Sequence, residues 1–233
     1  MRIKKDCVLS LDKFIDESLY NKKLGYYMKS NPFGEKGDFI TAPNISILFS
    51  EMIGVWVVSF WESLNSPKQF NLIELGAGNG EMMTILTGVF NKFPQFNSSC
   101  NIKILEKSKH LKKIQKQKIN NHKVKWLDDL KDLNNLPCIF IANEFFDALP
   151  IKQFIKKKNR WHERYVKFNN QIKSEYLDIP FDITELEEQL KFKISLKQNF
   201  IEYSPLTSEY LKDITSKISL NNGGILIIDY GYL

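Results

Sequence analysis

The stretch LIELGAGNGE, Leu72 to Glu81, joins an apolar run to three glycines at alternate positions. The apolar run predicts a buried strand, and the residues from about Glu81 to Lys92 predict a helix. A glycine-rich turn between a strand and a helix lets the backbone approach a ligand closely and presents unpaired amides at the start of the helix. These ten residues therefore predict a ligand site at the end of a strand in an α/β fold.

The glycine spacing narrows the class of ligand. Gly76, Gly78 and Gly80, with Ala77 inside the turn, follow a GxGxG pattern, whereas dinucleotide sites use GxGxxG and phosphate loops require Gly-Lys-Ser/Thr. Glu74 lies just before the turn, where its carboxylate would repel a pyrophosphate but could accept hydrogen bonds from the ammonium group of an amino acid. A carboxylate inside a buried strand needs such a partner.

The rest of the core alternates short apolar runs with helical patterns at 81–92 and 108–119. This alternation predicts a parallel sheet with helices on both faces. The expected strands are FNLIEL (70–75), NIKILE (101–106), KVKWL (123–127), CIFIAN (138–143) and GGILII (223–228).

The sequence outside these strands predicts further segments. Helical patterns cover residues 9–20 and Asn44 to Leu64, and the second pattern is apolar nearly all round, so we expect that helix to be buried. The glycine- and proline-rich residues 25–43 predict an irregular stretch, and the alternation over 152–177 predicts a small antiparallel β insertion. We expect four segments: an N-terminal helical and loop extension that covers the active site (1–70), the cofactor-binding core (71–150), a β-rich insertion (151–200) and the last helix and strand of the core (201–233).

Acidic residues at the ends of two other strands narrow the class of ligand further. Glu106 ends the second strand, where a carboxylate can bind both hydroxyls of a ribose, and Asp128 and Asp129 follow the third, where an acid could meet an adenine amino group. Together with Glu74 and the glycines they describe a site for S-adenosylmethionine. Two alternatives stay open: Glu106 could cap the helix that begins near Ser108, and the two aspartates could be turn residues.

A second acidic stretch, IANEFFDALP from Ile141 to Pro150, follows the fourth strand. In open α/β sheets, ligands bind beyond the carboxyl ends of the strands where the strand order switches. We expect the first and fourth strands to flank that switch. Asn143, Glu144 and Asp147 should then face the glycine turn across one cleft, unless Asp147 caps the next helix or turn.

The segment GDFITAP, residues 37–43, precedes the sheet and can fold over the same cleft. Gly37 gives it backbone freedom, and Asp38 and Thr41 offer polar contacts to cofactor or substrate. Asp38 could instead stabilise a turn.

Composition limits the other functional classes. The net charge is +6, but the lysines are scattered and only three arginines are present, so nucleic acid is not an expected partner. Three widely separated cysteines suggest neither a disulfide framework nor a metal site. No apolar run reaches the ~20 residues of a membrane span, and the first residues resemble neither a signal nor a transit peptide. We therefore expect a cytoplasmic protein, or a protein of the mitochondrial matrix if the chain is eukaryotic.

Several stretches together resemble the MidA-like class I methyltransferases. The resemblance rests on GYY, GDFITAP, the Glu74–Gly80 loop, IANEFFDALPI, W-x-E-R and the closing DYG, and it extends from about Leu19 to Tyr230. The family includes a mitochondrial complex I assembly factor that methylates an arginine of a complex I subunit. The resemblance implies a Rossmann-like methyltransferase sheet, S-adenosylmethionine as methyl donor, and methylation of a protein arginine.

An arginine substrate would give the acids after the fourth strand a catalytic role. Carboxylates hold a guanidinium by paired, charge-assisted hydrogen bonds, and a guanidinium keeps its proton up to pH ~12. We expect Glu144 to take this role first and Asp147 second, with Asn143 beside them. Because family members continue beyond DYG, we also expect the C-terminal strands of the sheet to be missing. Two alternatives remain: a non-catalytic assembly protein that keeps the fold, and a methyltransferase that acts on RNA or a small molecule.

Overall fold

The computed structural model describes residues 7–34, 37–39, 41–121, 123–168 and 174–230. The chain divides into two compact units. The first consists of Met1–Gly25 and Leu149–Glu209, and the second of Tyr26–Ala148 and Tyr210–Leu233. Among the described residues, no helix is both long and apolar enough to cross a membrane.

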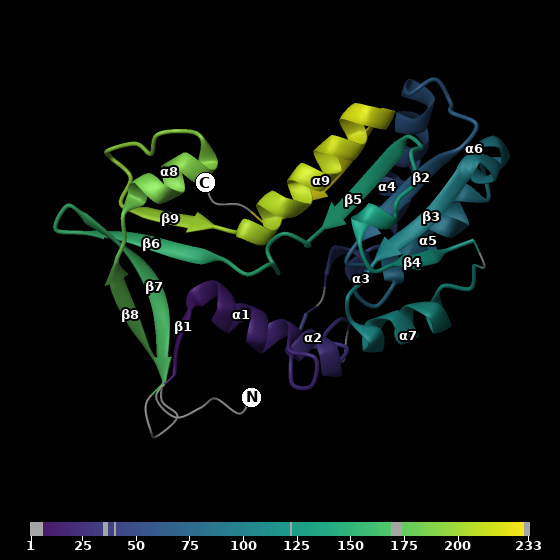
Figure 1. Ribbon diagram of the computed structural model, residues 1–233. Coiled ribbons are helices and arrows are strands. Elements are labelled where there is room, and N and C mark those ends of the chain that lie inside the picture. The colour runs from purple at the N-terminus through teal and green to yellow at the C-terminus, as the bar shows by residue number, and fades with distance from the viewer. Residues whose placement is uncertain (1–6, 35–36, 40, 122, 169–173, 231–233) are drawn as a thin grey trace. The chain divides into compact units, whose positions relative to one another are not determined.

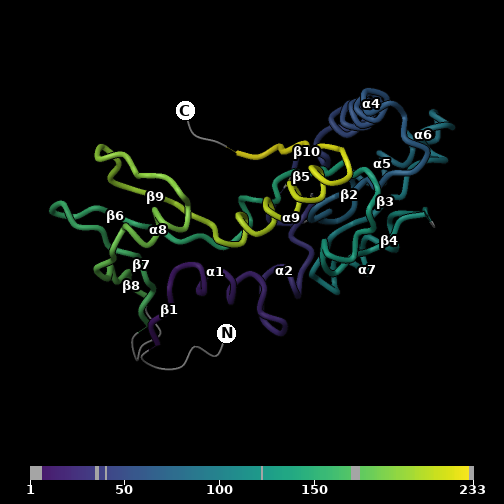
Figure 2. Tube along the Cα trace, turned by 45° about the horizontal axis from the view of Figure 1, so that its top comes forward, coloured from purple at the N-terminus to yellow at the C-terminus, as the bar shows by residue number. Residues whose placement is uncertain are grey.

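The second unit is built on a parallel sheet (Figure 1). Its strands are β2 (Phe70–Leu75), β3 (Cys100–Leu105), β4 (Lys125–Leu127), β5 (Cys138–Asn143) and β10 (Gly223–Ile228). They are ordered β10-β5-β2-β3-β4, and Figure 2 shows them side by side in this order. The order switches between β2 and β5, which pair with Leu75 opposite Ala142, so the ends of the first and fourth core strands are neighbours. This confirms the expected switch point.

Helices cover both faces of this sheet because alternate side chains of each strand point to opposite sides. On one face, Leu72 and Ile139 pack in a cluster with α4 (Ile47–Ser63), α5 (Glu81–Phe90) and α6 (Pro94–Ser99). On the other face, Ile73 and Phe140 pack with Ile214 of α9 (Pro205–Asn221). Full burial of such an aliphatic or aromatic side chain contributes about 1.5–3 kcal/mol. The expected α/β class is therefore confirmed.

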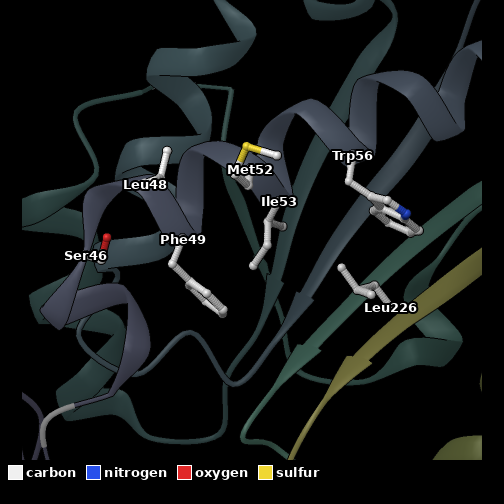
Figure 3. Close-up of a pocket in the computed structure, with 7 residues that line it drawn as sticks. All are labelled: Ser46, Leu48, Phe49, Met52, Ile53, Trp56 and Leu226. Atoms are coloured by element: carbon white, nitrogen blue, oxygen red, sulfur yellow. The ribbon is translucent and has the colours of Figure 1, made fainter.

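The expectation that the apolar helix after residue 44 is buried all round was wrong. Helix α4 begins at Ile47, because Ala42–Ile45 forms a separate turn, α3, and Ser46 between them is extended. Ile53 and Val57 face the core, but Leu48 and Met52 are 62% and 59% exposed. Figure 3 shows the resulting apolar groove, of about 420 Å³, lined by Ser46, Leu48, Phe49, Met52, Ile53, Trp56 and Leu226.

The segment expected to be irregular also contains α2 (Tyr26–Lys29), with Phe33 and Phe39 forming an isolated β-bridge between α2 and α3. The prediction of a wholly irregular stretch was therefore wrong at both ends. Helix α7 (Lys109–Lys118) follows β3, and the short helix η1 (Leu130–Asp132) follows β4.

The first unit is an antiparallel sheet that carries two helices. Its strands are β1 (Val8–Ser10), β6 (Lys152–Lys157), β7 (Arg160–Phe168), β8 (Ser174–Pro180) and β9 (Phe200–Tyr203), in the order β1-β7-β6-β9 with β8 paired to β7. The helices are α1 (Leu11–Tyr20) and α8 (Ile183–Leu190), and Leu11 of α1 packs on Val166 and Phe168 of β7. The antiparallel insertion is thus confirmed over the described part of 152–177. Residues 169–173 of that range lie outside the described residues. The helix expected from residue 9 begins two residues later because Val8–Ser10 pairs with β7.

Candidate functional site

The glycine turn requires glycine for two physical reasons. Gly76, Gly78 and Gly80 have φ values of +65°, +53° and +80°, a region that side chains make unfavourable. A Cβ atom on Gly76 would also lie 2.8 Å from the ring of Phe145. The Gly76 amide donates to the carbonyl of Leu105 (2.9 Å), which ties the turn to the end of β3.

Glu74 presents an unsatisfied acceptor at the same end of β2. Its side chain is 2% exposed, and its Oε2 has no hydrogen-bond partner among the described residues. Burial, together with the nearby Glu106 carboxylate, raises the pKa of Glu74 to about 8. Buried polar atoms are nearly always paired in folded proteins, so this carboxylate is suited to a ligand that brings a donor.

A cavity of about 50 Å³ brings the glycine turn and the acidic stretch together. It is lined by Phe33, Thr41, Pro43, Asn44, Glu74, Gly76, Ala77, Gly78, Asn79, Glu81, Met82, Asn143 and Glu144. Asn143 adds a second buried acceptor, because its Oδ1 lacks a partner in the described structure. The sequence predicted seven of these residues: Thr41, Glu74, Gly76, Ala77, Gly78, Asn143 and Glu144. The other predicted residues, Gly37, Asp38, Gly80, Glu106, Asp128, Asp129 and Asp147, do not line it.

Glu144 occupies a constrained position after β5. Its φ is +49°, although it is not glycine, and its amide donates to the carbonyl of Ile228 (2.8 Å). Its carboxylate accepts hydrogen bonds from the backbone of Ala42 and the side chain of Asn143. Burial, and to a smaller degree the charges of Asp147 and Asp229, still raises the pKa of Glu144.

Asp147 lies in the same turn, outside the cavity and with more of its surface exposed. Desolvation and the neighbouring Asp229 charge raise its pKa as well. Desolvation, and to a smaller degree the charges of Asp147 and Glu144, raises the pKa of the Tyr27 phenol. The surroundings of the acidic turn therefore disfavour the ionised form of Glu144 and Asp147, and a nearby cation would offset this effect.

Glu106 is buried beside the glycine turn. Its Oε1 accepts from the amide of Ser108 (2.8 Å) and its Oε2 from Nε2 of Gln115 (3.0 Å). Ser108 is itself the N-cap of α7, since its Oγ accepts from the amide of Leu111 (3.2 Å). These hydrogen bonds lower the pKa of Glu106, but burial has the larger effect, so the pKa is raised overall. Glu106 thus helps to hold the helix start, and its role toward a ribose stays a prediction.

The two aspartates after β4 form turn and ion-pair contacts. Asp128 is exposed and paired with Lys112, which lowers the pKa of the carboxyl. Asp129 caps η1 by accepting from the amide of Lys131 (2.9 Å). A contact with adenine stays a prediction for both.

The segment before α4 covers the glycine turn with aromatic rings. Phe33 packs against Gly78, where a Cβ atom would lie 3.4 Å from its ring, and Tyr27 stacks on Phe33 with centroids 6.0 Å apart. Asp38 accepts from the hydroxyl of Tyr26, so its role here is to stabilise the segment. Gly37 is required for packing, because a Cβ atom would lie 2.2 Å from the Pro32 carbonyl oxygen.

Sequence reasoning missed three residues that organise the site. Gln115 is fully buried: its Nε2 also donates to the Gly78 carbonyl (2.9 Å), and its Oε1 accepts from the indole of Trp126 (2.8 Å). Asn79 donates to Asn44 (3.1 Å), which ties α3 to the glycine turn. Gln115 lies in a lysine-rich helix and resembles a surface residue, but Asn79, placed between two of the glycines, could have been suspected.

No group of three or more His, Cys, Asp or Glu side chains in the described residues is arranged to hold a metal ion. His122 lies outside those residues.

Comparisons with known proteins support one family. The family model described as "putative S-adenosyl-L-methionine-dependent methyltransferase" matches residues 52–233. The chain is 29% identical over 256 residues to "protein arginine methyltransferase NDUFAF7, mitochondrial" of Xenopus laevis, covering 100% of this chain and 59% of that protein. The human protein of the same name is 28% identical over 255 residues, covering 99% and 58%. The chain thus spans about 59% of the length of the curated relatives that it matches.

A crystal structure from Burkholderia thailandensis with bound S-adenosyl-homocysteine has the same fold, with a TM-score of 0.79 and 21% identity. The alignment covers 97% of this chain and 59% of that chain.

Proposed function

The chain belongs to the family of S-adenosyl-L-methionine-dependent methyltransferases, and on that premise we propose that it transfers a methyl group to a guanidinium nitrogen of a protein arginine. One observation carries the proposal. Glu74 and Asn143, two buried acceptors without donors in the described structure, share a cavity with the glycine turn and with Glu144. The names of the curated relatives support the choice of arginine.

The residues present fit the cofactor. Gly76 and Gly78 line the cavity without side chains that would keep a ligand from their backbone, and Glu74 offers a carboxylate to an ammonium group. When bound, S-adenosylmethionine supplies an electrophilic methyl group on a sulfonium. Phe33 lies over Gly78 and limits the cavity to a volume well below the ~300–1,000 Å³ of typical ligand sites. The segment that carries Phe33 must therefore shift to admit the nucleoside.

Glu144 is our first candidate for orienting the acceptor. Its carboxylate lines the cavity and is fixed by Ala42 and Asn143, so it presents a defined acceptor to a guanidinium N–H. A bound cation favours the ionised carboxylate and offsets the raised pKa. Glu144 can then take the proton that the substituted nitrogen releases, and Asp147 supplies a second negative charge at the rim.

The resemblance supports a subunit of respiratory complex I as the protein substrate, and hence a role in complex I assembly. The names of the relatives assign those proteins to mitochondria, which supports a mitochondrial rather than a cytoplasmic location if the chain is eukaryotic. Proteome-wide mass spectrometry with and without the gene would identify the modified arginine.

Methyl transfer itself can be tested with radiolabelled S-adenosylmethionine and a lysate that lacks the protein. We expect label on protein arginine with the wild type and at least a ~100-fold lower rate with Glu144→Gln, because a positioned acid–base group contributes about 10²–10⁴-fold. Asp132→Asn, a change at an exposed acid on η1, is the control. Label that follows RNA or small molecules would replace the arginine proposal. Full complementation by Glu144→Gln would favour a non-catalytic assembly role.

A further inference from the structure

We propose that Asp229 is a positioning residue that holds the Glu144–Asp147 turn in the shape needed to orient the methyl acceptor. The inference rests on the proposed function of that turn. It concerns a residue far away in the sequence, which follows the last strand of the sheet, β10.

The hydrogen bonds of the Asp229 carboxylate carry the argument. Its Oδ2 accepts from the backbone amides of both Phe146 and Asp147 (3.2 Å each), and its Oδ1 accepts from the amide of Tyr230 (2.9 Å). Both oxygens are therefore committed to backbone donors. Two of these three donors belong to the acidic turn.

The sheet brings Asp229 to this place. Ile228 of β10 lies opposite Asn143 of β5, so the residues that follow the two strands are neighbours. The Glu144 amide donates to the carbonyl of Ile228, and the next side chain, Asp229, takes the two later amides of the turn. The end of β10 thus binds three of the four amides from Glu144 to Asp147.

The conformation of Glu144 explains why the turn needs this anchor. Its φ of +49° is unfavourable for a residue with a side chain, and such conformations persist only where the surroundings enforce them. Without Asp229, the turn can relax toward negative φ, and that change would move the Glu144 carboxylate away from the cavity.

An anchor role also explains an otherwise unfavourable choice of residue. Asp229 adds a third negative charge beside Glu144 and Asp147, and it raises the pKa of both. That repulsion is acceptable only if the carboxylate has another use, and one carboxylate oxygen accepting from two amides is such a use.

Two substitutions separate geometry from charge. Asp229→Ala removes the acceptors, and Asp229→Asn keeps one acceptor oxygen but removes the charge; Asp132→Asn controls for the loss of a surface charge. We expect Asp229→Ala to lower kcat by about 10²-fold, the effect of a misplacement of about 1 Å. The asparagine variant should recover at least ~10-fold of this loss, and the dissociation constant for S-adenosyl-homocysteine should change by less than ~3-fold in all variants, because Asp229 does not line the cavity. An unchanged kcat, or an equal loss of kcat and cofactor affinity, would overturn the inference.

A second measurement does not depend on turnover. Hydrogen exchange, followed with S-adenosyl-homocysteine present, should be at least ~10-fold faster at the amides of Phe146 and Asp147 in Asp229→Ala, with β2 unchanged. If wild-type protein transfers no methyl group, the proposed function fails while this readout still decides whether Asp229 anchors the turn. Unchanged exchange at both amides would refute the anchor.

Discussion

Replacing Glu74 with glutamine should remove most of the pH dependence of cofactor binding near neutrality. The wild-type carboxyl is buried without a donor, and its pKa is raised to about 8. An ammonium group on the ligand favours the ionised carboxylate, so binding must first displace the proton. Affinity should therefore rise as the pH increases toward 8 and level off above it.

The size of the effect follows from the pKa. With a value of about 8, about one Glu74 in eleven is ionised at pH 7 and about half are ionised at pH 8. A ligand that binds only the ionised form then gains about fivefold in affinity between pH 7 and pH 8, or about 1 kcal/mol. At pH 7, binding should release about 0.9 proton from this group.

Titration calorimetry with S-adenosyl-homocysteine at several pH values, in buffers of different ionisation enthalpy, measures both the affinity as a function of pH and the number of protons released on binding. The ligand's own amino group titrates in the same range, but its contribution is common to the wild type and to Glu74→Gln. The difference between the two proteins in the slope of affinity against pH therefore gives the contribution of Glu74. Equal slopes and equal proton release would show that Glu74 is not the group that binds the ammonium.

Three further changes test other parts of the structure. Gly78→Val, which places a β-branched residue at a φ of +53°, should lower the affinity for S-adenosyl-homocysteine by more than ~100-fold by calorimetry while far-UV circular dichroism is kept. Gln115→Leu leaves several buried groups unpaired and should destabilise the protein by about 2–3 kcal/mol in urea unfolding; a loss under ~0.5 kcal/mol would contradict the buried network. Ile53→Ala should cost about 2–5 kcal/mol and Ile47→Ala less than ~0.5 kcal/mol, because the first faces the core and the second is 64% exposed; equal losses would show that α4 is not two-faced.

The parallel sheet could be predicted because its signals are local. Each core strand is a short apolar run. The glycine turn contains three glycines, the residue type that most readily adopts positive φ values, so the sequence alone indicates a tight turn there. The switch between the first and fourth strands followed from the usual rules of α/β topology, and the pairing of Leu75 with Ala142 agrees with it. Glu74 and Glu144 could be assigned to one cleft for the same reason.

Features that depend on tertiary packing could not be predicted in this way. Helix α4 is apolar nearly all round, so its sequence gives little indication of which face meets the sheet, and in the structure Leu48 is exposed whereas Ile53 and Val57 are buried. The uses of Gln115 and Asp229 arise from hydrogen bonds between segments distant in the sequence.

The order of the strands in the parallel sheet also determines when the complete site can form during folding. Glu74, Glu144 and Asp229 lie in or just after three strands that are distant in the sequence, so the cavity together with its anchored turn requires both the β2–β5 and the β5–β10 pairings. Closing such long loops is slow, and no partly folded chain that lacks β10 would retain the anchored turn. Turnover is therefore a more sensitive reporter of the fully assembled unit than cofactor affinity, and ligand at about 100 times its dissociation constant would stabilise the folded state by about 2.7 kcal/mol.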